Sequence, residues 1–503
     1  MRATRLPLTI VLLILLGSLP VVQADPIPRG LEFRINSSYT GQSNVIASDV
    51  DEAGNYVIVW ASQVATNLPD VYVRRFGANG EPSGLEAQVN STLPGSFGAA
   101  VALRPDGGFL VIWAFAGPAD EAVRGIAGRF YDSQGSPTSD EIIFYSFGPG
   151  LPSAIGRPTQ PRILMDSNGD FVVIWIMYTS YLDAYAQRFD SSGTPLGTYF
   201  QLNVDYAIGV NIHADMDSVG NWIVTWVNSE VNVPSTNPPS YVYARLFNAE
   251  GTARTEEVRV SDDPQEFVEH PKIATAADGQ FVVVWSALRQ GTRNDVYGQL
   301  FDADGNRRGV QFRVNTFWEG EQVAPMVAMD SAGNFVVVWV NYPVPMSSSY
   351  DIRGQWFDNL GIPNGSEFIV SSNNGVPSEP IVEQPTESTA MFAFNRRTAR
   401  GTEVFGRLFD LTNTRPPIRN FYTTPVVNLS WLPVDSINQY HIQVDNQSSF
   451  ASPEVSIANL PASPAFETPP LPPGQYSWRV RAQRLNGTWT NWSAVDTFVI
   501  GAP

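Results

Sequence analysis

A run of five apolar residues that ends in tryptophan recurs along most of this chain, and it constrains the fold more than any other feature. Six copies are clear, and a seventh, degenerate copy ends in phenylalanine. The copies lie at residues 56–60, 109–113, 171–175, 222–226, 281–285, 335–339 and 390–394. A strand that is apolar at nearly every position is buried on both faces, so the pattern predicts a stack of repeated β-sheets.

Three more short strands accompany each apolar run. One precedes the run, as in residues 161–165, and a second follows it and ends in phenylalanine, as in residues 296–301. A third reads Glu-Phe-x-Val-Asn or similar, as in residues 86–90. Turns rich in Asp and Gly join the strands, and glycine supplies the positive φ that such turns need. The repeat therefore predicts an all-β fold with four strands in each unit of about 55 residues.

The order of the strands predicts a closed ring. The third accompanying strand follows only the first six repeats and is missing after the seventh, at residues 411–415. Its seventh copy, residues 32–36, lies ahead of the first repeat. We expect this N-terminal strand to pair with the strand that ends at Phe409, because closure removes the exposed edges of the sheets.

Because the strands follow this order, residues 31–412 resemble the seven-bladed β-propellers. Their repeat is similar to those of bacterial extracellular proteins. The chain lacks the Gly-His and Trp-Asp pairs of WD40 repeats and the Asp-box of sialidases. The resemblance implies a closed β-propeller, and propellers host both binding proteins and enzymes.

The C-terminal residues, 416–503, lack the repeat and alternate apolar with polar residues, as a small antiparallel β-sandwich does. Residues 471–476 (Leu-Pro-Pro-Gly-Gln-Tyr) look like a tyrosine corner, and residues 489–493 resemble a tryptophan/serine ladder. The segment therefore resembles a fibronectin type III domain, which implies a spacer or adhesive module. We expect three parts: a signal peptide (1–24), a seven-bladed β-propeller (25–415) and a fibronectin type III-like β-sandwich (416–503).

The N-terminus is typical of an export signal. Arg2 and Arg5 precede an apolar run at residues 6–19, and residues 22–24 offer small side chains for cleavage. We expect a secreted or cell-surface bacterial protein, with the periplasm as an alternative, and a monomer without stable membrane insertion after cleavage. The net charge of -18 disfavours nucleic acid as a partner. The absence of cysteine excludes disulfides and thiolate metal sites.

Candidate ligand-binding residues lie just before the inner strand of each repeat, where the repeats differ from one another. In a propeller these positions gather around one mouth of the central channel. The candidates are Asn44, Phe97, Gln160, Asn211, Glu269, His270 and Glu379. Such a ring of polar, acidic and aromatic groups suits a polar ligand, since hydrogen bonds orient it while an aromatic face stacks.

No motif for catalysis is present: there is no Gly-x-Ser-x-Gly elbow, His-Glu-x-x-His helix or phosphate loop. Glu269 and Glu379 are the least arbitrary carboxylate pair for glycosidase chemistry, and His213 lies at the start of an inner strand. We predict no cofactor. Calcium at Asp/Gly turns such as residues 166–170 and 302–306 stays open beside ordinary hairpin-turn chemistry.

The lack of an unrepeated acid–base motif favours a non-catalytic function. The sequence predicts an exported binding or adhesion protein that recognises a polysaccharide or an extracellular protein through the propeller face. The alternative is a carbohydrate-active enzyme, a glycosidase or lyase, on a propeller scaffold.

Overall fold

A computed structural model of the chain describes its strands and most of the connecting turns. The described residues are 26–29, 32–37, 42–63, 69–93, 98–116, 124–147, 158–178, 182–204, 211–229, 240–262, 267–288, 293–317, 320–342, 350–372, 379–386, 389–398, 401–411, 420–422, 426–430, 437–447, 450, 452–461, 465–472, 474–484, 487–489, 492 and 496–500. Every regular element in these ranges is a β-strand, as the sequence predicts. In the same ranges no helix is long and apolar enough to cross a membrane. The predicted signal peptide and Phe97 lie outside the described residues.

Six antiparallel four-stranded sheets follow one another along the chain, and we call them blades 1 to 6. Blade 1 has β3 (Gln42–Val50), β4 (Tyr56–Gln63), β5 (Asp70–Phe76) and β6 (Ala87–Gln88). Blade 2 has β7 (Ala99–Leu103), β8 (Phe109–Ala116), β9 (Arg124–Tyr131) and β10 (Ile142–Phe147). Blade 3 has β11 (Pro158–Met165), β12 (Phe171–Tyr178), β13 (Leu182–Phe189) and β14 (Phe200–Gln201).

The next three blades repeat this order. Blade 4 has β15 (His213–Met216), β16 (Trp222–Ser229), β17 (Ser240–Phe247) and β18 (Val258–Arg259). Blade 5 has β19 (Phe267–Thr275), β20 (Phe281–Leu288), β21 (Asn294–Phe301) and β22 (Arg307–Arg313). Blade 6 has β23 (Glu321–Met329), β24 (Phe335–Tyr342), β25 (Asp351–Phe357) and β26 (Pro363–Ser372).

Blade 7 combines both ends of the repeat region. It has β27 (Ile381–Thr386), β28 (Thr389–Thr398) and β29 (Gly401–Asp410), and two N-terminal strands pair with β29. These strands are β1 (Ile27–Pro28) and β2 (Phe33–Arg34). Phe33 is opposite Gly406 and Arg34 is opposite Phe405, which confirms the predicted pairing of the N-terminal strand. The additional pairing of β1 with β29 was not predicted.

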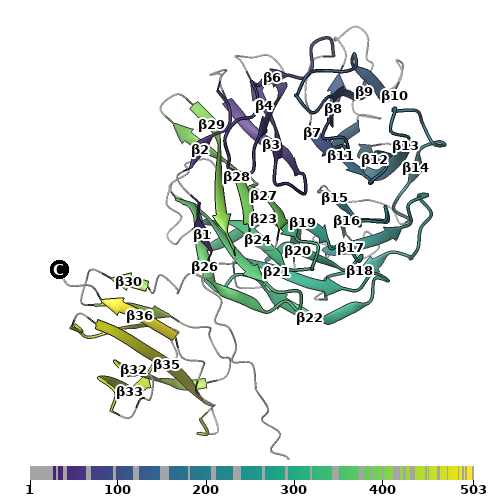
Figure 1. Cartoon of the computed structure of the whole chain (residues 1–503). Helices are drawn as coiled ribbons and strands as arrows, with labels where there is room; N and C mark the ends of the chain where they lie inside the picture. Colours follow the sequence, from purple (N-terminus) through teal and green to yellow (C-terminus); the bar gives the residue numbers. More distant parts are fainter. Residues whose placement is uncertain are drawn as a thin grey trace, which may run out of the picture.

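The blades are arranged around a common centre, as Figure 1 shows. Each blade has its first strand innermost, and these inner strands contact one another in the order β3, β7, β11, β15, β19, β23 and β27, with β27 again in contact with β3. The sheets of a propeller stack face to face in this way, so the fold is an all-β propeller.

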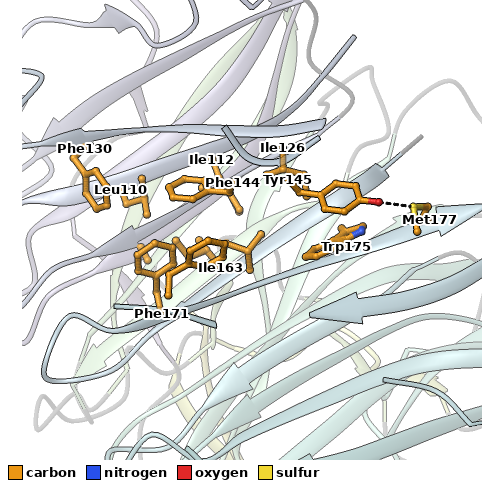
Figure 2. Close-up of a cluster of buried hydrophobic side chains, with 14 residues drawn as sticks. Leu110, Ile112, Ile126, Phe130, Phe144, Tyr145, Ile163, Phe171, Trp175 and Met177 are labelled. Atoms are coloured by element: carbon orange, nitrogen blue, oxygen red, sulfur yellow. Dashed lines mark hydrogen bonds between the residues drawn. The ribbon is translucent and has the colours of Figure 1, made fainter. Parts of the chain in front are cut away.

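The hydrophobic cores lie between neighbouring blades, which explains why the central strands are apolar on both faces. Between blades 2 and 3, Phe144 and Tyr145 of β10 pack on the strand that carries Phe171 and Trp175 (Figure 2). The Tyr145 hydroxyl donates to the sulfur of Met177 at 3.2 Å. Trp175 is fully buried, and its truncation to alanine would cost about 3–5 kcal/mol.

The recurring Asp and Asn residues at strand ends have structural roles. Asn315 Oδ1 accepts a hydrogen bond from the Val296 amide at 2.8 Å, and its Nδ2 donates to Asp295 at 2.7 Å. Asn203 with Asp183 repeats this arrangement in blade 3. In the Asp/Gly turns the aspartate accepts backbone amides, as Asp302 does from Asn306 at 2.8 Å. These bonds are ordinary hairpin-turn chemistry.

The C-terminal residues form two further sheets. One has the order β30 (Asn420–Tyr422), β36 (Asp496–Ile500), β35 (Gly474–Arg484), β32 (Ile437–Asp445) and β33 (Val455–Leu460). The other pairs β31 (Asn428–Ser430) with β34 (Ala465–Glu467). Leu429 of β31 and Ile442 of β32 share one buried core, so the two sheets form a β-sandwich. The Tyr476 hydroxyl donates to the Pro472 carbonyl at 2.9 Å, as the tyrosine-corner motif predicts.

Candidate active site

The inner strands surround a cavity of about 620 Å³ at the centre of the ring. All seven of these strands contribute to its wall. The apolar run of each blade fixes the register of its inner strand, because the two pair residue by residue. Positions in different blades can therefore be compared by their distance from the tryptophan that ends the run.

Three carboxyl groups occupy one level of the cavity wall, and we call them the acidic layer: Asp49, Asp215 and Glu383. Each lies eleven residues before the aromatic residue that ends its apolar run. They come from blades 1, 4 and 7, whereas the same position is Ala102, Leu164, Ala274 and Ala328 in the other blades. The acidic layer is therefore a feature that the repeat itself does not require.

Two residues earlier on the inner strands, a second level carries basic side chains, and we call it the basic layer: Arg162, His213 and Lys272. Each lies thirteen residues before its tryptophan, in the consecutive blades 3, 4 and 5. Lys272 is the only lysine in the sequence, and its side chain is 3% exposed. Residues two apart on a strand rise by roughly 7 Å, so the two layers are close enough to face one ligand.

The carboxyls of the acidic layer are hydrogen-bonded to the next blade. Asp215 Oδ2 accepts the Thr275 amide at 2.7 Å, and Asp49 Oδ2 accepts the Leu103 amide at 2.7 Å. Glu383 Oε1 accepts the Ser48 hydroxyl at 2.7 Å. These bonds hold the carboxyls in place on the cavity wall and brace the blades against one another.

Burial nevertheless keeps the acidic layer protonated to unusually high pH. It raises the pKa of Asp49 to about 6 and that of Asp215 to about 7, against the opposing effect of the backbone hydrogen bonds. Burial also raises the pKa of Glu383 well above its usual value, and the charge of Asp49 adds to this shift. Low-dielectric surroundings penalise the charged form, so these groups hold their protons at pH values where ordinary carboxyls are ionised.

Glu379 is held in the opposite state. Its Oε2 lies 2.9 Å from Lys272 Nζ, and its Oε1 lies 3.6 Å from His270 Nε2. Burial alone would raise its pKa, but the charge and hydrogen bond of Lys272, with His270 and Arg162, lower the pKa to about 2. Its side chain is 39% exposed, and that surface faces the cavity that Glu379 lines. Glu379 is therefore an ionised carboxylate inside the cavity.

His213 is a neutral imidazole. Burial lowers its pKa well below the usual value, and the charges of Lys272 and Arg162 lower it further. The Ile273 amide donates to Nδ1 at 3.3 Å, which assigns the ring proton to Nε2. Burial likewise lowers the pKa of Lys272, with Glu379 acting in the opposite direction.

The structure brings together some of the residues predicted from the sequence. Glu269 Oε2 lies 3.9 Å from His270 Nδ1, so Glu269, His270 and Glu379 form one group with Lys272. The pair predicted for glycosidase chemistry, Glu269 and Glu379, is thus linked through an imidazole.

The remaining predicted residues act between blades. Gln160 Oε1 accepts the Asn211 amide at 3.2 Å, which joins blade 3 to blade 4. Asn44 Oδ1 accepts a bond from Asn395 at 3.2 Å, which joins blade 1 to blade 7. Phe97 is not among the described residues.

Several predicted residues have a left-handed backbone that is uncommon outside glycine. The φ values are 51° at Gln160, 89° at Asn211 and 53° at His270. Two of them, Gln160 and His270, lie within register shifts of their inner strands. Bulges and left-handed residues re-aim side chains and gather at functional sites.

Sequence reasoning missed Asp49, Arg162, Asp215, Lys272 and Glu383. The signal was present in the repeat register, where these charged residues replace the small or apolar residues of other blades. The structure places the single lysine, Lys272, in the cavity wall.

No family model matches the chain, and a search of curated proteins gives no match. Several solved structures align with about three quarters of the chain. An ulvan lyase of polysaccharide lyase family 25 aligns with a TM-score of 0.48 at 10% identity, over 74% of this chain and 95% of its own. An α-L-arabinanase of Penicillium chrysogenum aligns with a TM-score of 0.39 at 11% identity, over 77% of this chain and 98% of its own.

A third neighbour is the β-propeller domain of the Trilobed protease of Pyrococcus furiosus. It aligns with a TM-score of 0.42 at 8% identity, over 75% of this chain and all of its own. At such identities the similarity concerns the fold and assigns no residue or substrate to this chain.

The function predicted first from the sequence, an exported, non-catalytic binding or adhesion protein, disagrees with these neighbours, of which the lyase and the arabinanase are named as enzymes. We withdraw that first prediction as wrong. Its physical basis also fails, because the cavity does contain titratable groups that are not repeated in every blade.

Proposed function

We propose that the protein is a carbohydrate-active enzyme that cleaves a polysaccharide in the central cavity. One observation carries the proposal: two carboxyl groups line the same cavity, and their surroundings push their pKa values in opposite directions. The pKa of Asp215 is raised to about 7, and that of Glu379 is lowered to about 2. Titratable groups whose environments push their pKa values apart are the signature of an acid paired with a base.

The chemistry of the glycosidic bond needs both states. A proton donor protonates the leaving oxygen, and a second carboxylate stabilises positive charge or activates water. Asp215 suits the donor, because a pKa near the working pH balances the protonated fraction against acid strength. Glu379 suits the second role. Both carboxyls line the same cavity, and the two carboxyls of a glycosidase lie about 5–10 Å apart.

Asp215 is a better candidate for the donor than the other two members of the acidic layer. It shares β15 with His213 and therefore lies next to the basic layer. Asp49 and Glu383 come from the adjacent blades 1 and 7; the charge of Asp49 raises the pKa of Glu383 and also that of Asp215. We assign to that pair the bracing of the blades through Leu103 and Ser48.

We also propose that the chain is exported through residues 1–24, acts outside the cytoplasm as a monomer and has seven blades in one catalytic unit. The C-terminal sandwich is proposed to be a fibronectin type III-like spacer, supported by the Tyr476 corner. A polysaccharide is the partner that the cavity chemistry supports. These assignments rest on the sequence pattern and on the bonds described above.

The test is product release by a chain that begins at residue 25, on a panel of neutral and acidic polysaccharides. Reducing-end and unsaturated-product assays together detect both hydrolysis and elimination. Asp215→Asn should lower the rate about 100-fold or more. Asp304→Asn, at an exposed turn position, is the matched control and should keep full activity. No product from any substrate, or an unchanged rate in Asp215→Asn, would contradict the proposal.

A further inference from the structure

The guanidinium of Arg162 has free binding capacity inside the cavity. Its Nε donates to the Ile212 carbonyl at 3.3 Å, which fixes the orientation of the planar group. Within the described residues no hydrogen bond is recorded for its two terminal nitrogens, and the side chain lines the cavity. An arginine fork of this kind matches the two oxygens of a carboxylate or sulfate.

Lys272 places a second cation on the same wall. Its ammonium group is almost fully buried and forms an ion pair with Glu379 at 2.9 Å. Burying a charge costs free energy unless the charge is paired, and Glu379 supplies that partner for Lys272 in the cavity wall. The electrostatic effect of Arg162 on Lys272 and of Glu379 on Arg162 shows that the three groups act on one another.

The charge of this wall is opposite to that of the whole molecule. Arg162 and Lys272 contribute two positive charges, and Glu379 contributes one negative charge. The acidic layer is largely neutral at mildly acidic pH, because burial raises the pKa of Asp49 and of Asp215. Glu269 lies nearby, but it is 45% exposed and therefore screened by solvent. The chain as a whole carries a formal charge of -18.

We propose that Arg162 and Lys272 form a subsite for the anionic group of an acidic sugar, so that the substrate is a uronate- or sulfate-bearing polysaccharide. That the bound polysaccharide is also cleaved rests on the proposed function. The subsite itself is a binding property and does not depend on cleavage. A protein with a strongly negative net charge repels anions at long range, so a positive wall in the central cavity selects them. Neutral sugars lack the negative charge that two cations in the cavity wall attract.

Binding is measured by calorimetry on the chain that begins at residue 25, with tetrasaccharides of glucuronate and of galacturonate. A sulfated galactose tetrasaccharide distinguishes sulfate from carboxylate. Methyl esters of the two uronate probes, and the unsulfated form of the third, are the neutral partners of equal shape. We expect at least one acidic probe to bind ten times or more tightly than its neutral partner, with an affinity that falls as salt rises.

Three variants locate the subsite. Arg162→Gln should remove most of the preference for the acidic probe, and Arg162→Lys, which keeps the charge without the fork, should retain part of it. Arg188→Gln removes the same charge from the outer part of the same blade and should change nothing. Melting temperatures of all three show whether each variant is folded.

The outcomes separate this inference from the proposed function. Equal affinity for acidic and neutral probes, no binding of any acidic probe, or an unchanged preference in Arg162→Gln overturns the subsite. Cleavage of neutral polysaccharides alone also overturns it, while the enzyme proposal stands. Binding that depends on Arg162 without cleavage of any substrate supports the subsite and contradicts the enzyme.

Discussion

Individual carboxyls in this propeller have opposite effects on stability at different pH. Glu383 is buried against Asp49, which raises its pKa, whereas Glu141 of blade 2 accepts bonds from the loop that follows Asn90. Burial opposes the effect of those bonds, but the bonds from Thr92 and Ser91 lower the Glu141 pKa to about 2. The protein therefore combines carboxyls that stabilise the fold more at low pH with carboxyls that stabilise it more at high pH.

The Glu383→Gln variant should lose less stability than the wild type as the pH rises above mildly acidic values. A raised folded pKa means that Glu383 contributes stability below its ordinary value of 4.5, and that this contribution is lost as pH rises through the folded pKa. The amide oxygen of glutamine still accepts the Ser48 hydroxyl. We expect the melting temperature of the variant to fall less than that of the wild type between about pH 5 and about pH 8.

The control for that measurement is Glu141→Gln, which has the opposite sign. Its lowered folded pKa gives stability above 4.5 that is lost as pH falls toward about 2, so the variant should be less stable than the wild type above about pH 5 and should lose less stability as the pH falls. If the melting temperatures of Glu383→Gln and the wild type changed in parallel over the whole pH range, the raised pKa assigned to Glu383 would be contradicted.

The site was only partly predictable at the level of residues. Glu379 precedes its inner strand and His270 lies in the first half of another, so their position near one end of the inner strands follows from the repeat. Asp49 and Asp215 lie inside strands, where an isolated acid is easily taken for an exposed residue. Their importance comes from burial between blades, and burial depends on contacts between segments far apart in the sequence.

Among the elements, the outermost strand of several blades contributes a phenylalanine that fits over a glycine of its neighbour. A Cβ added at Gly298 would meet the Phe312 ring at 2.8 Å, and one at Gly354 would meet Phe368 at 2.6 Å. Gly406 of β29 has the same relation to Phe33 of the N-terminal strand, at 2.6 Å. The closing strand therefore uses the same packing as strands that follow their blades directly.

Gly406→Ala should destabilise the protein through Phe33. The added methyl group forces the ring to move, and overpacking of this kind costs about 1–3 kcal/mol. The expected result is a lower melting temperature, and a much smaller effect when Phe33→Ala is already present. Gly84→Ala, where the new Cβ meets nothing within 4 Å, is the matched control. An equal effect of Gly406→Ala with and without Phe33 would contradict closure by this strand.

The elements were the most predictable part of the fold. A missing strand at one end and a surplus strand at the other can be counted in the sequence, and β2 pairs as that count requires. β1 was missed because a two-residue strand that contains proline carries no periodic pattern. The register shifts in the inner strands were also missed.

For the whole molecule, we predict that residues 416–503 fold without the propeller. The sandwich has its own buried core, which includes Val427, Tyr440 and Trp478. A separate fragment should give a strand-rich spectrum and one cooperative melting transition. Tyr476→Phe should lower that transition, because the bond to the Pro472 carbonyl is lost. A disordered fragment would mean that the domain boundary is wrong.

The most direct test of the enzyme account is the pH dependence of kcat/KM on the polysaccharide that the chain cleaves. We predict that the rate falls as pH rises through about 7, where the Asp215 carboxyl loses its proton. The same profile measured for Asp215→Asn should lose this basic limb together with most of the rate. A rate that stays constant through that range, or a basic limb that persists in Asp215→Asn, would contradict the assignment of Asp215 as the acid.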